Sequence, residues 1–363
     1  LGFPVPEPAP RPITTGNLYQ TIEEIVAAHP EKEFSWLLEK NYQIVTDETL
    51  EDVCKYIRDW DGYVFYDTET TGLDITFKSR IGQADQLVGV VLSVKYGESF
   101  FFPTQMKAIK NLCGGDHFYF MEHYMRPILE GKELITHNGG FDWKVAYIYD
   151  INCNIVHDTM WLIALTLGAS RLNWRLSLKE NARLLLHRDS LELSDLIVDG
   201  AWGEDENIKF WDLPYNLVRL YACADTDNTQ GLFKYAMETD LLGKYNANKV
   251  YQIEVAFMFA VAYQEFYGHK IDITALDKVR EDIAKIQETT MVKMEEIAGK
   301  PFNPNSPAQL IDIMYHQLGI PEQISRKTGR PTTDKDTIKK LAEMTNIDDE
   351  PLYPFASYLS EYR

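Results

Sequence analysis

The chain has 363 residues, a formal net charge of −19 and 45% hydrophobic content. This length and composition suit a large enzyme with more than one hydrophobic core. No run approaches the roughly 18 apolar residues of a membrane span. The four cysteines lack Cys-x-x-Cys spacing, which argues against a zinc ribbon or a disulfide scaffold and favours a reducing compartment. We therefore expect an enzyme that is not embedded in a membrane.

The first residue is Leu1, and prolines recur at every second position from Pro4 to Pro12. A segment with this many prolines does not pack as a helix or a sheet. We expect residues 1–41 to form an exposed extension or linker.

From about Tyr42 the pattern becomes that of an α/β domain. We expect a short strand, a helix over 50–59, a strand that carries Asp67 and Glu69, a hairpin of 87–94 with 99–102, a helix over 122–129, a strand over 134–136 and further helices after 142. Residues 42–245 are thus predicted to form a mixed sheet flanked by helices.

Residues 246–363 are predicted to be helical. Leu276, Val279, Ile283 and Ile286 recur at spacings of three and four, and so narrow an apolar stripe suits an arm of two antiparallel helices. Residues 326–340 are basic, and a local basic patch can bind a nucleic-acid backbone within an acidic protein. A solvated loop explains this stretch equally well.

Three short motifs carry four carboxylates. Asp67 and Glu69 lie two apart on a strand and so share one face. Tyr221 and Asp225 lie four apart in a segment with helical character, 217–236, and so share a helix face. Asp142 follows a Gly-Gly pair. Clustered carboxylates repel one another and raise their own pKa values unless cations neutralise them.

An all-oxygen ligand set favours Mg²⁺ or Mn²⁺ over zinc. Two such ions about 3.5–4 Å apart form the clamp used for in-line displacement at phosphorus. The hydroxyl of Tyr221 can orient the attacking water. Each fragment alone is a common solvated turn or helix, but joined in this order they predict a nuclease.

The segments Tyr-Asp-Thr-Glu-Thr-Thr-Gly-Leu (66–73), His-Asn-Gly-Gly-Phe-Asp (137–142) and Tyr-Ala-Cys-Ala-Asp-Thr-Asp (221–227) resemble the motifs of a known family. It is the 3′→5′ proofreading exonuclease domain of family A, DNA polymerase I-like, enzymes. Tyr221, four residues before Asp225, marks the tyrosine branch; Leu220 stands where the histidine branch would have histidine. The resemblance implies a ribonuclease H-like fold for 42–245. Segments 301–310, 318–320 and 328–333 resemble the thumb, so 246–363 would be the first part of a polymerase domain that stops before palm and fingers.

The resemblance also implies roles for single residues. Asp67, Glu69 and Asp225 would bind the more tightly held of two Mg²⁺ or Mn²⁺ ions, Asp67 would bridge to the second ion, Asp142 would support that ion through water, and Tyr221 would orient the attacking water. The frayed 3′ end of DNA would contact Thr70, Leu73, Asn138, Phe141 and Arg171, although Leu73 and Phe141 are also compatible with core positions. His137 suits either a substrate-side or a structural role. Gly139 and Gly140 replace bulkier residues common in the family.

The implied partners are single-stranded DNA 3′ ends, primer-template duplex at the thumb, and the rest of the polymerase, either in cis or as a separate subunit. We favour a fragment of a longer polymerase. A cytoplasmic or nucleoid-associated protein is expected, and a virus-encoded one acting in the host cytoplasm is compatible with the sequence. Two rival functions are an RNA 3′-exonuclease of the same branch, which would lack a thumb, and a nuclease-like binding module without catalysis, against which the four carboxylates count.

Overall fold

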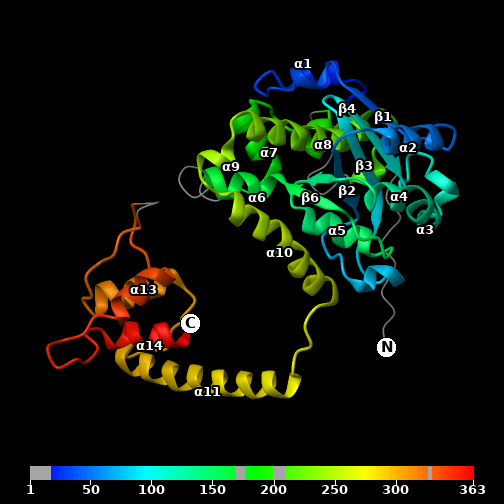
Figure 1. The fold of residues 1–363 in the computed structure, drawn as a ribbon. Coiled ribbons are helices and arrows are strands. Elements are labelled where there is room, and N and C mark those ends of the chain that lie inside the picture. Colours follow the sequence, from blue (N-terminus) through cyan, green and yellow to red (C-terminus); the bar gives the residue numbers. More distant parts are fainter. Residues whose placement is uncertain (1–17, 169–175, 199–208, 326–328) are drawn as a thin grey trace. The chain divides into compact units, whose positions relative to one another are not determined.

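The structure, a computed structural model, describes residues 18–168, 176–198, 209–325 and 329–363. The chain divides into two compact units, one that ends at His269 and one that runs from Lys270 to Arg363 (Figure 1). None of the helices in these described ranges is long and apolar enough to cross a membrane.

A six-stranded sheet in the order β1-β4-β3-β2-β5-β6 forms the centre of the first unit. Its strands are β1 (Asn41–Ile44), β2 (Val64–Thr70), β3 (Leu87–Lys95), β4 (Glu98–Pro103), β5 (Leu134–Thr136) and β6 (Ile155–Asp158). β3 and β4 form the expected hairpin, and β2 runs antiparallel to β3 but parallel to β5. The predicted mixed sheet is therefore confirmed.

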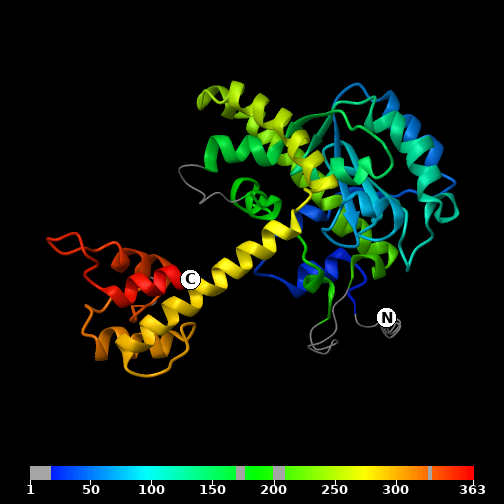
Figure 2. The same cartoon turned by 90° about the horizontal axis from the view of Figure 1, so that it is seen from below.

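Helices cover both faces of this sheet (Figures 1 and 2). They are α1 (Ile22–Ala28), α2 (Leu50–Asp59), α3 (His117–Phe120), α4 (Arg126–Leu129), α5 (Gly139–Tyr147), α6 (Thr159–Ile163), α7 (Leu178–Asn181), α8 (Tyr215–Glu238), α9 (Leu241–Lys244) and α10 (Asn248–Tyr267). Shorter 3-10 or π-helical turns are η2 (Ser35–Leu37), η3 (Phe77–Ile81), η4 (Leu112–Gly115), η5 (Met121–Met125), η6 (Ala164–Gly168), η7 (Ala182–Leu186), η8 (Leu193–Leu196) and η9 (Phe210–Asp212). Because η5 joins α3 to α4, the helix expected over 122–129 begins earlier, at His117.

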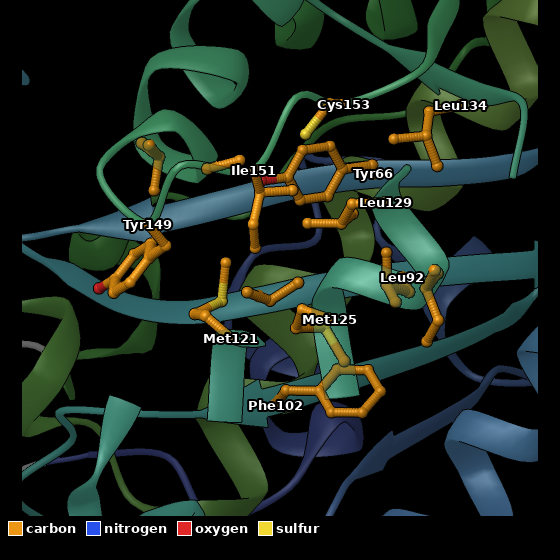
Figure 3. Close-up of a cluster of buried hydrophobic side chains, with 14 of the residues drawn as sticks. Tyr66, Leu92, Phe102, Met121, Met125, Leu129, Leu134, Tyr149, Ile151 and Cys153 are labelled. Atoms are coloured by element: carbon orange, nitrogen blue, oxygen red, sulfur yellow. The ribbon is translucent and has the colours of Figure 1, made fainter. Parts of the chain in front are cut away.

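Alternation along β2 sends its side chains into two different cores. Val64 and Tyr66 pack with residues of α2, α4 and α5, and Figure 3 shows Tyr66 beside Leu129 and Cys153. Phe65 packs instead with residues of α6 and α8. The same alternation places Asp67 and Glu69, further along the strand, on the face that α8 covers.

The segment before the sheet packs against it, which corrects one expectation. α1 begins with a capping box between Thr21 and Glu24, and Ile25, Phe34 and Leu37 are buried in one core with residues of α8. The exposed extension predicted for 1–41 is therefore wrong from residue 18 onward. The prolines on which it rested lie before residue 13, outside the described residues, and the sequence after them has an amphipathic helix.

The first unit also extends beyond the expected domain boundary at 245/246. Met258, Ala262 and Phe266 of α10 pack in the same core as Trp143 of α5. Gly140 permits this close approach, because a Cβ at this position would lie 3.2 Å from Cγ of Met258. The compact unit thus includes α10, while the assignment of 246–363 to a polymerase domain stays a prediction.

The second unit is helical, as predicted. It contains α11 (Ile273–Ala298), α12 (Pro307–Ile311), the π-helical turn η10 (Asp312–Gln317), α13 (Lys335–Ala342) and α14 (Pro354–Tyr362). Met294 and Ala298 of α11 share a core with Phe355 and Leu359 of α14. The earlier part of the α11 stripe is more open, since Val279 and Ile283 are about half exposed.

The packing of α1 can be tested by Ile25→Ala. Ile25 is fully buried, so we expect the free energy of unfolding of the first unit to fall by about 2–4 kcal/mol in urea denaturation followed by circular dichroism. The matched control is Ile81→Ala, where the side chain is 64% exposed and the change should stay within about 0.5 kcal/mol. Equal effects of the two substitutions would contradict a packed α1.

Candidate active site

Asp67 and Glu69 lie near the carboxyl end of β2. The residues before them, Val64 to Tyr66, are buried in the centre of the sheet, whereas both carboxylates are half-buried. A buried strand therefore delivers two acidic side chains to one edge of the core, on the face covered by α8.

Tyr221 and Asp225 come from α8, one turn apart. Leu217, Val218 and Ala222 are buried in the core and orient the helix, leaving Tyr221 and Asp225 half-buried. Burial raises the pKa of the Tyr221 hydroxyl well above its usual range, and the charges of Glu69 and Asp225 raise it further. Tyr221 of α8 therefore lies near enough to Glu69 of β2 for the charge of that carboxylate to act on it.

Asp142 approaches the same strand from the first turn of α5. The Thr68 hydroxyl donates a hydrogen bond to Oδ1 of Asp142 at 2.7 Å, and the Tyr66 hydroxyl donates to its backbone carbonyl at 3.3 Å. Thr68 and Tyr66 alternate with Asp67 along β2. Because side chains alternate along the strand, Asp67 faces α8, whereas Tyr66 and Thr68 on the other face hold Asp142.

The turn before α5 is constrained by backbone geometry. Asn138 adopts the left-handed conformation with φ of 66°, and the Gly139 N–H donates to Asp158 at 2.6 Å. A Cβ on Gly139 would lie 2.1 Å from Oγ1 of Thr136, so only glycine fits. This turn sets where α5 begins and hence where Asp142 lies.

Burial raises the pKa values of all four carboxylates, and the charges of the other carboxylates raise those of Asp67 and Glu69 further. Burial is the largest cause in each case, and it raises the pKa of Asp67 well above the ordinary value, with further contributions from Asp142, Glu69 and Asp225. Burial and Asp225 raise the pKa of Glu69 to about 8. The pKa of Asp142 rises to about 7 and that of Asp225 to about 6. Carboxylates from three separate segments thus lie near enough to Asp67 for their charges to act on it.

The fit of these residues to divalent cations can be judged from the spacing of their side chains, their donor atoms and their charge. Within the described ranges, no group of three or more His, Cys, Asp or Glu side chains converges closely enough to hold a metal ion. The donor set is nevertheless all oxygen, which suits Mg²⁺ or Mn²⁺, and a cation would relieve the repulsion that helps to raise the pKa values of Asp67 and Glu69. The fit is one of ligand type and charge.

Two charged residues that the motifs did not indicate also face this site. The Lys179 ammonium lies 2.9 Å from the Glu192 carboxylate and 5.1 Å from the centre of the Tyr221 ring. Its charge lowers the pKa of Glu69 and of Asp225. Neither residue belongs to a recognisable sequence pattern, because only the fold brings α7 and residue 192 next to α8.

The expected DNA contacts differ in their surroundings. Leu73 is 85% exposed, so the alternative of a core position is wrong for it. Phe141 is half-buried against the core, the Thr70 hydroxyl donates to the Gly72 carbonyl at 2.7 Å, and Asn138 is exposed. Arg171 lies outside the described residues. The DNA-binding role of all five stays a prediction.

His137 has structural contacts on both ring nitrogens. Nδ1 lies 2.8 Å from Oγ1 of Thr159 and Nε2 lies 2.7 Å from the Leu176 carbonyl. Burial lowers the pKa of the imidazole. Of the two roles considered for His137, these contacts favour the structural one.

No protein-family model matches the chain, but individual proteins do. It is 24% identical over 328 residues to DNA polymerase I of Chloroflexus aurantiacus, which covers 88% of this chain and 32% of that protein. It is 25% identical over 281 residues to DNA polymerase DpoZ of Salmonella phage PMBT28, covering 75% of this chain and 41% of that one. The chain is a relative of DNA polymerase I. This confirms the resemblance carried by the three motifs.

The fold agrees with this relationship to DNA polymerase I. The POL domain of Pol1 from M. smegmatis, solved with DNA primer-template and dNTP, superposes with a TM-score of 0.55 at 17% identity, over 88% of this chain and 47% of that one. At this identity the likeness is one of fold alone. The chain spans about a third of the length of the DNA polymerase I of C. aurantiacus.

The raised pKa values of the carboxylates predict how the stability of the protein depends on pH when metal is absent. A carboxyl whose pKa is raised in the folded state stabilises that state fully below its unfolded pKa and loses this contribution as pH rises through the folded pKa. For Glu69 that range runs from its usual value of about 4 to about 8. We therefore expect the Tm of wild type in EDTA to fall over this range.

At pH 8 in EDTA, Asp67→Asn removes the buried carboxyl whose pKa Asp142, Glu69 and Asp225 all raise. We expect a gain of roughly 1–2 kcal/mol, or a Tm higher by about 2–6 °C, and a smaller gain at pH 5. Differential scanning calorimetry measures both, with Asp52→Asn on the exposed face of α2 as the matched control. A Tm for Asp67→Asn below that of wild type at pH 8 would show that the carboxylates do not repel one another.

Proposed function

We propose that this chain is the 3′→5′ proofreading exonuclease portion of a family A DNA polymerase, which removes nucleoside monophosphates from the 3′ end of single-stranded DNA. The observation that supports it most is the electrostatic coupling of Asp67 with Glu69, Asp142 and Asp225. Their coming together from three motifs, in a relative of DNA polymerase I, favours hydrolysis at phosphorus over a purely structural role.

In this proposal Asp67, Glu69 and Asp225 would hold the tighter of two divalent ions, and Asp142 would support the second. When bound, the ions supply activation of water and stabilisation of the leaving oxygen. The protein positions the ligands: β2 presents Asp67 and Glu69, and Thr68 fixes the carboxylate of Asp142 by its hydrogen bond.

Tyr221 has the role of orienting the attacking water. Its raised pKa keeps the phenol protonated at neutral pH, so its hydroxyl can both donate and accept a hydrogen bond. Orientation of a reacting water in this way lowers the entropic part of the barrier.

The frayed 3′ end would lie along Thr70, Leu73, Asn138 and Phe141, with Arg171 as a phosphate contact. The high exposure of Leu73 leaves its side chain available to stack on a terminal base. A 3′ end held in this way must be single-stranded.

The second unit is proposed to bind primer-template duplex as the start of a thumb. Arg330, Lys335, Lys339 and Lys340 are exposed there, and exposed cations bind phosphates by releasing counterions. Nucleotide addition would belong to a palm and fingers in cis or on a separate subunit. The proposed setting is the cytoplasm or nucleoid, including that of a cell infected by a virus that encodes the protein.

The nuclease proposal predicts loss of activity when one carboxylate is removed. Wild type should shorten 5′-labelled single-stranded DNA one nucleotide at a time in Mg²⁺. Asp67→Ala or Asp225→Ala should slow this by about a thousandfold or more, because a bound ion contributes several kcal/mol to the transition state. Gel analysis of the ladder reports both rate and direction.

The control variant is Asp52→Ala, which removes an exposed carboxylate of α2 and should leave the rate unchanged. An RNA strand of the same sequence tests the RNA-exonuclease alternative. Undiminished cleavage by Asp67→Ala, or preferential cleavage of RNA, would refute the proposal. Tyr221→Phe should reduce the rate while leaving Mg²⁺ affinity intact, since it removes only a hydroxyl.

Proofreading requires a preference for mismatched primer ends. Unpairing a 3′ end costs a few kcal/mol, and a mismatch removes part of this cost, so we expect a mismatched terminus to be cut about tenfold faster than a matched one. Single-turnover rates on the two duplexes, with the single strand as reference, provide the measurement. Equal rates on both duplexes would argue for a nuclease that does not proofread.

A further inference from the structure

The ring of Tyr221 is held by two residues that belong to none of the three motifs. The Lys179 ammonium lies 5.1 Å from the ring centre. The Phe210 ring lies with its centre 5.6 Å away at an interplanar angle of 45°. Both contacts act on the ring and leave the hydroxyl untouched.

The hydroxyl group of Tyr221 does not fix the orientation of the side chain in the way that the ring contacts do. Among the residues that the structure describes, none accepts a hydrogen bond from it. The orientation of the phenol, and therefore the place of its oxygen, rests on what packs against the ring. For a residue whose role is to orient one water molecule, an error of about 1 Å is costly.

Lys179 is itself fixed at this position. It donates to the Leu191 carbonyl at 3.0 Å and forms its ion pair with Glu192 at 2.9 Å, and its side chain is 27% exposed. A lysine side chain has four flexible bonds and is normally free to swing. Its two partners in adjacent positions, 191 and 192, hold the ammonium in place beside the Tyr221 ring.

The charge of Lys179 also suits this place. A cation beside an aromatic ring is attracted by the ring quadrupole. Its charge lowers the pKa values of Glu69 and Asp225, and the charges of these two carboxylates raise the pKa of Tyr221. The ion pair with Glu192 therefore holds a cation where the ring and two carboxylates meet.

We propose that Lys179, held by Glu192, is a positioning residue that fixes the Tyr221 ring so that its hydroxyl reaches the attacking water. This inference rests on the proposed nuclease function. It differs from a role in which Lys179 binds a DNA phosphate, which would act on substrate affinity, and from a role in which it neutralises the carboxylates, which would not depend on Tyr221.

The test is a double-mutant cycle between Lys179 and Tyr221. Lys179→Met keeps the length of the side chain and removes its charge, and it is made in wild type and in Tyr221→Phe. In wild type at saturating Mg²⁺ we expect kcat on single-stranded DNA to fall by about 3- to 30-fold, the range that one cation–π contact allows, with KM changed by less than about twofold. In Tyr221→Phe, where the hydroxyl is absent, the same substitution should change kcat by less than about twofold.

Further variants separate positioning from general damage. Lys179→Arg should retain most of the wild-type kcat, because a cation remains beside the ring. Glu192→Ala, which frees Lys179, should lower kcat in wild type but not in Tyr221→Phe. Lys55→Met removes another ion-paired lysine, whose partner is Asp59 on α2, and should have no effect. Agreement of the Arg and Glu192 variants with these expectations supports the proposal even if Lys179→Met folds poorly.

Two results would overturn the positioning role while leaving the nuclease intact. One is an equal loss of kcat from Lys179→Met in both backgrounds. The other is a loss confined to KM, which would assign Lys179 to DNA binding. A wild-type protein without nuclease activity, or an active Asp67→Ala variant, would instead remove the proposed function on which this inference rests.

Discussion

The burial of four carboxylates is the constraint on which the rest of the site depends. Asp67, Glu69, Asp142 and Asp225 come from a strand and two helices, burial raises the pKa of each, and the charges of the others raise the pKa values of Asp67 and Glu69 further. A fold that gathers such charges gives up stability at neutral pH unless cations neutralise them.

The surrounding structure holds the carboxylates in place against that repulsion. The β2 strand is buried on both faces before Asp67, so its position is set by two hydrophobic cores. The Thr68 hydroxyl fixes Asp142, and the close approach of Gly139 to Thr136 fixes the start of α5. α8 is anchored by its own buried residues. Rigid elements thus supply the precision that a reaction centre needs.

Much of this arrangement could be predicted from local patterns. Strand alternation placed Asp67 and Glu69 on one face, and helical periodicity placed Tyr221 and Asp225 together, because both follow from the geometry of one element. The hairpin of β3 and β4 and the helix over 50–59 were predicted for the same reason. The similarity to DNA polymerase I over most of the chain agrees with the resemblance that the three motifs carry.

Other features depended on contacts between distant segments. Residues 18–41 were predicted to continue a proline-rich extension, yet Ile25 and Phe34 are buried in a core that includes residues of α8. Helix α10 packs in the first unit, where Gly140 leaves room for Met258.

The sequence by itself determined which face of its own strand or helix each candidate residue occupies, since this follows from backbone periodicity. Only the tertiary structure decided that Phe210 and Lys179, the latter paired with Glu192, lie beside the Tyr221 ring, because side chains far apart in sequence meet through packing that no local pattern records.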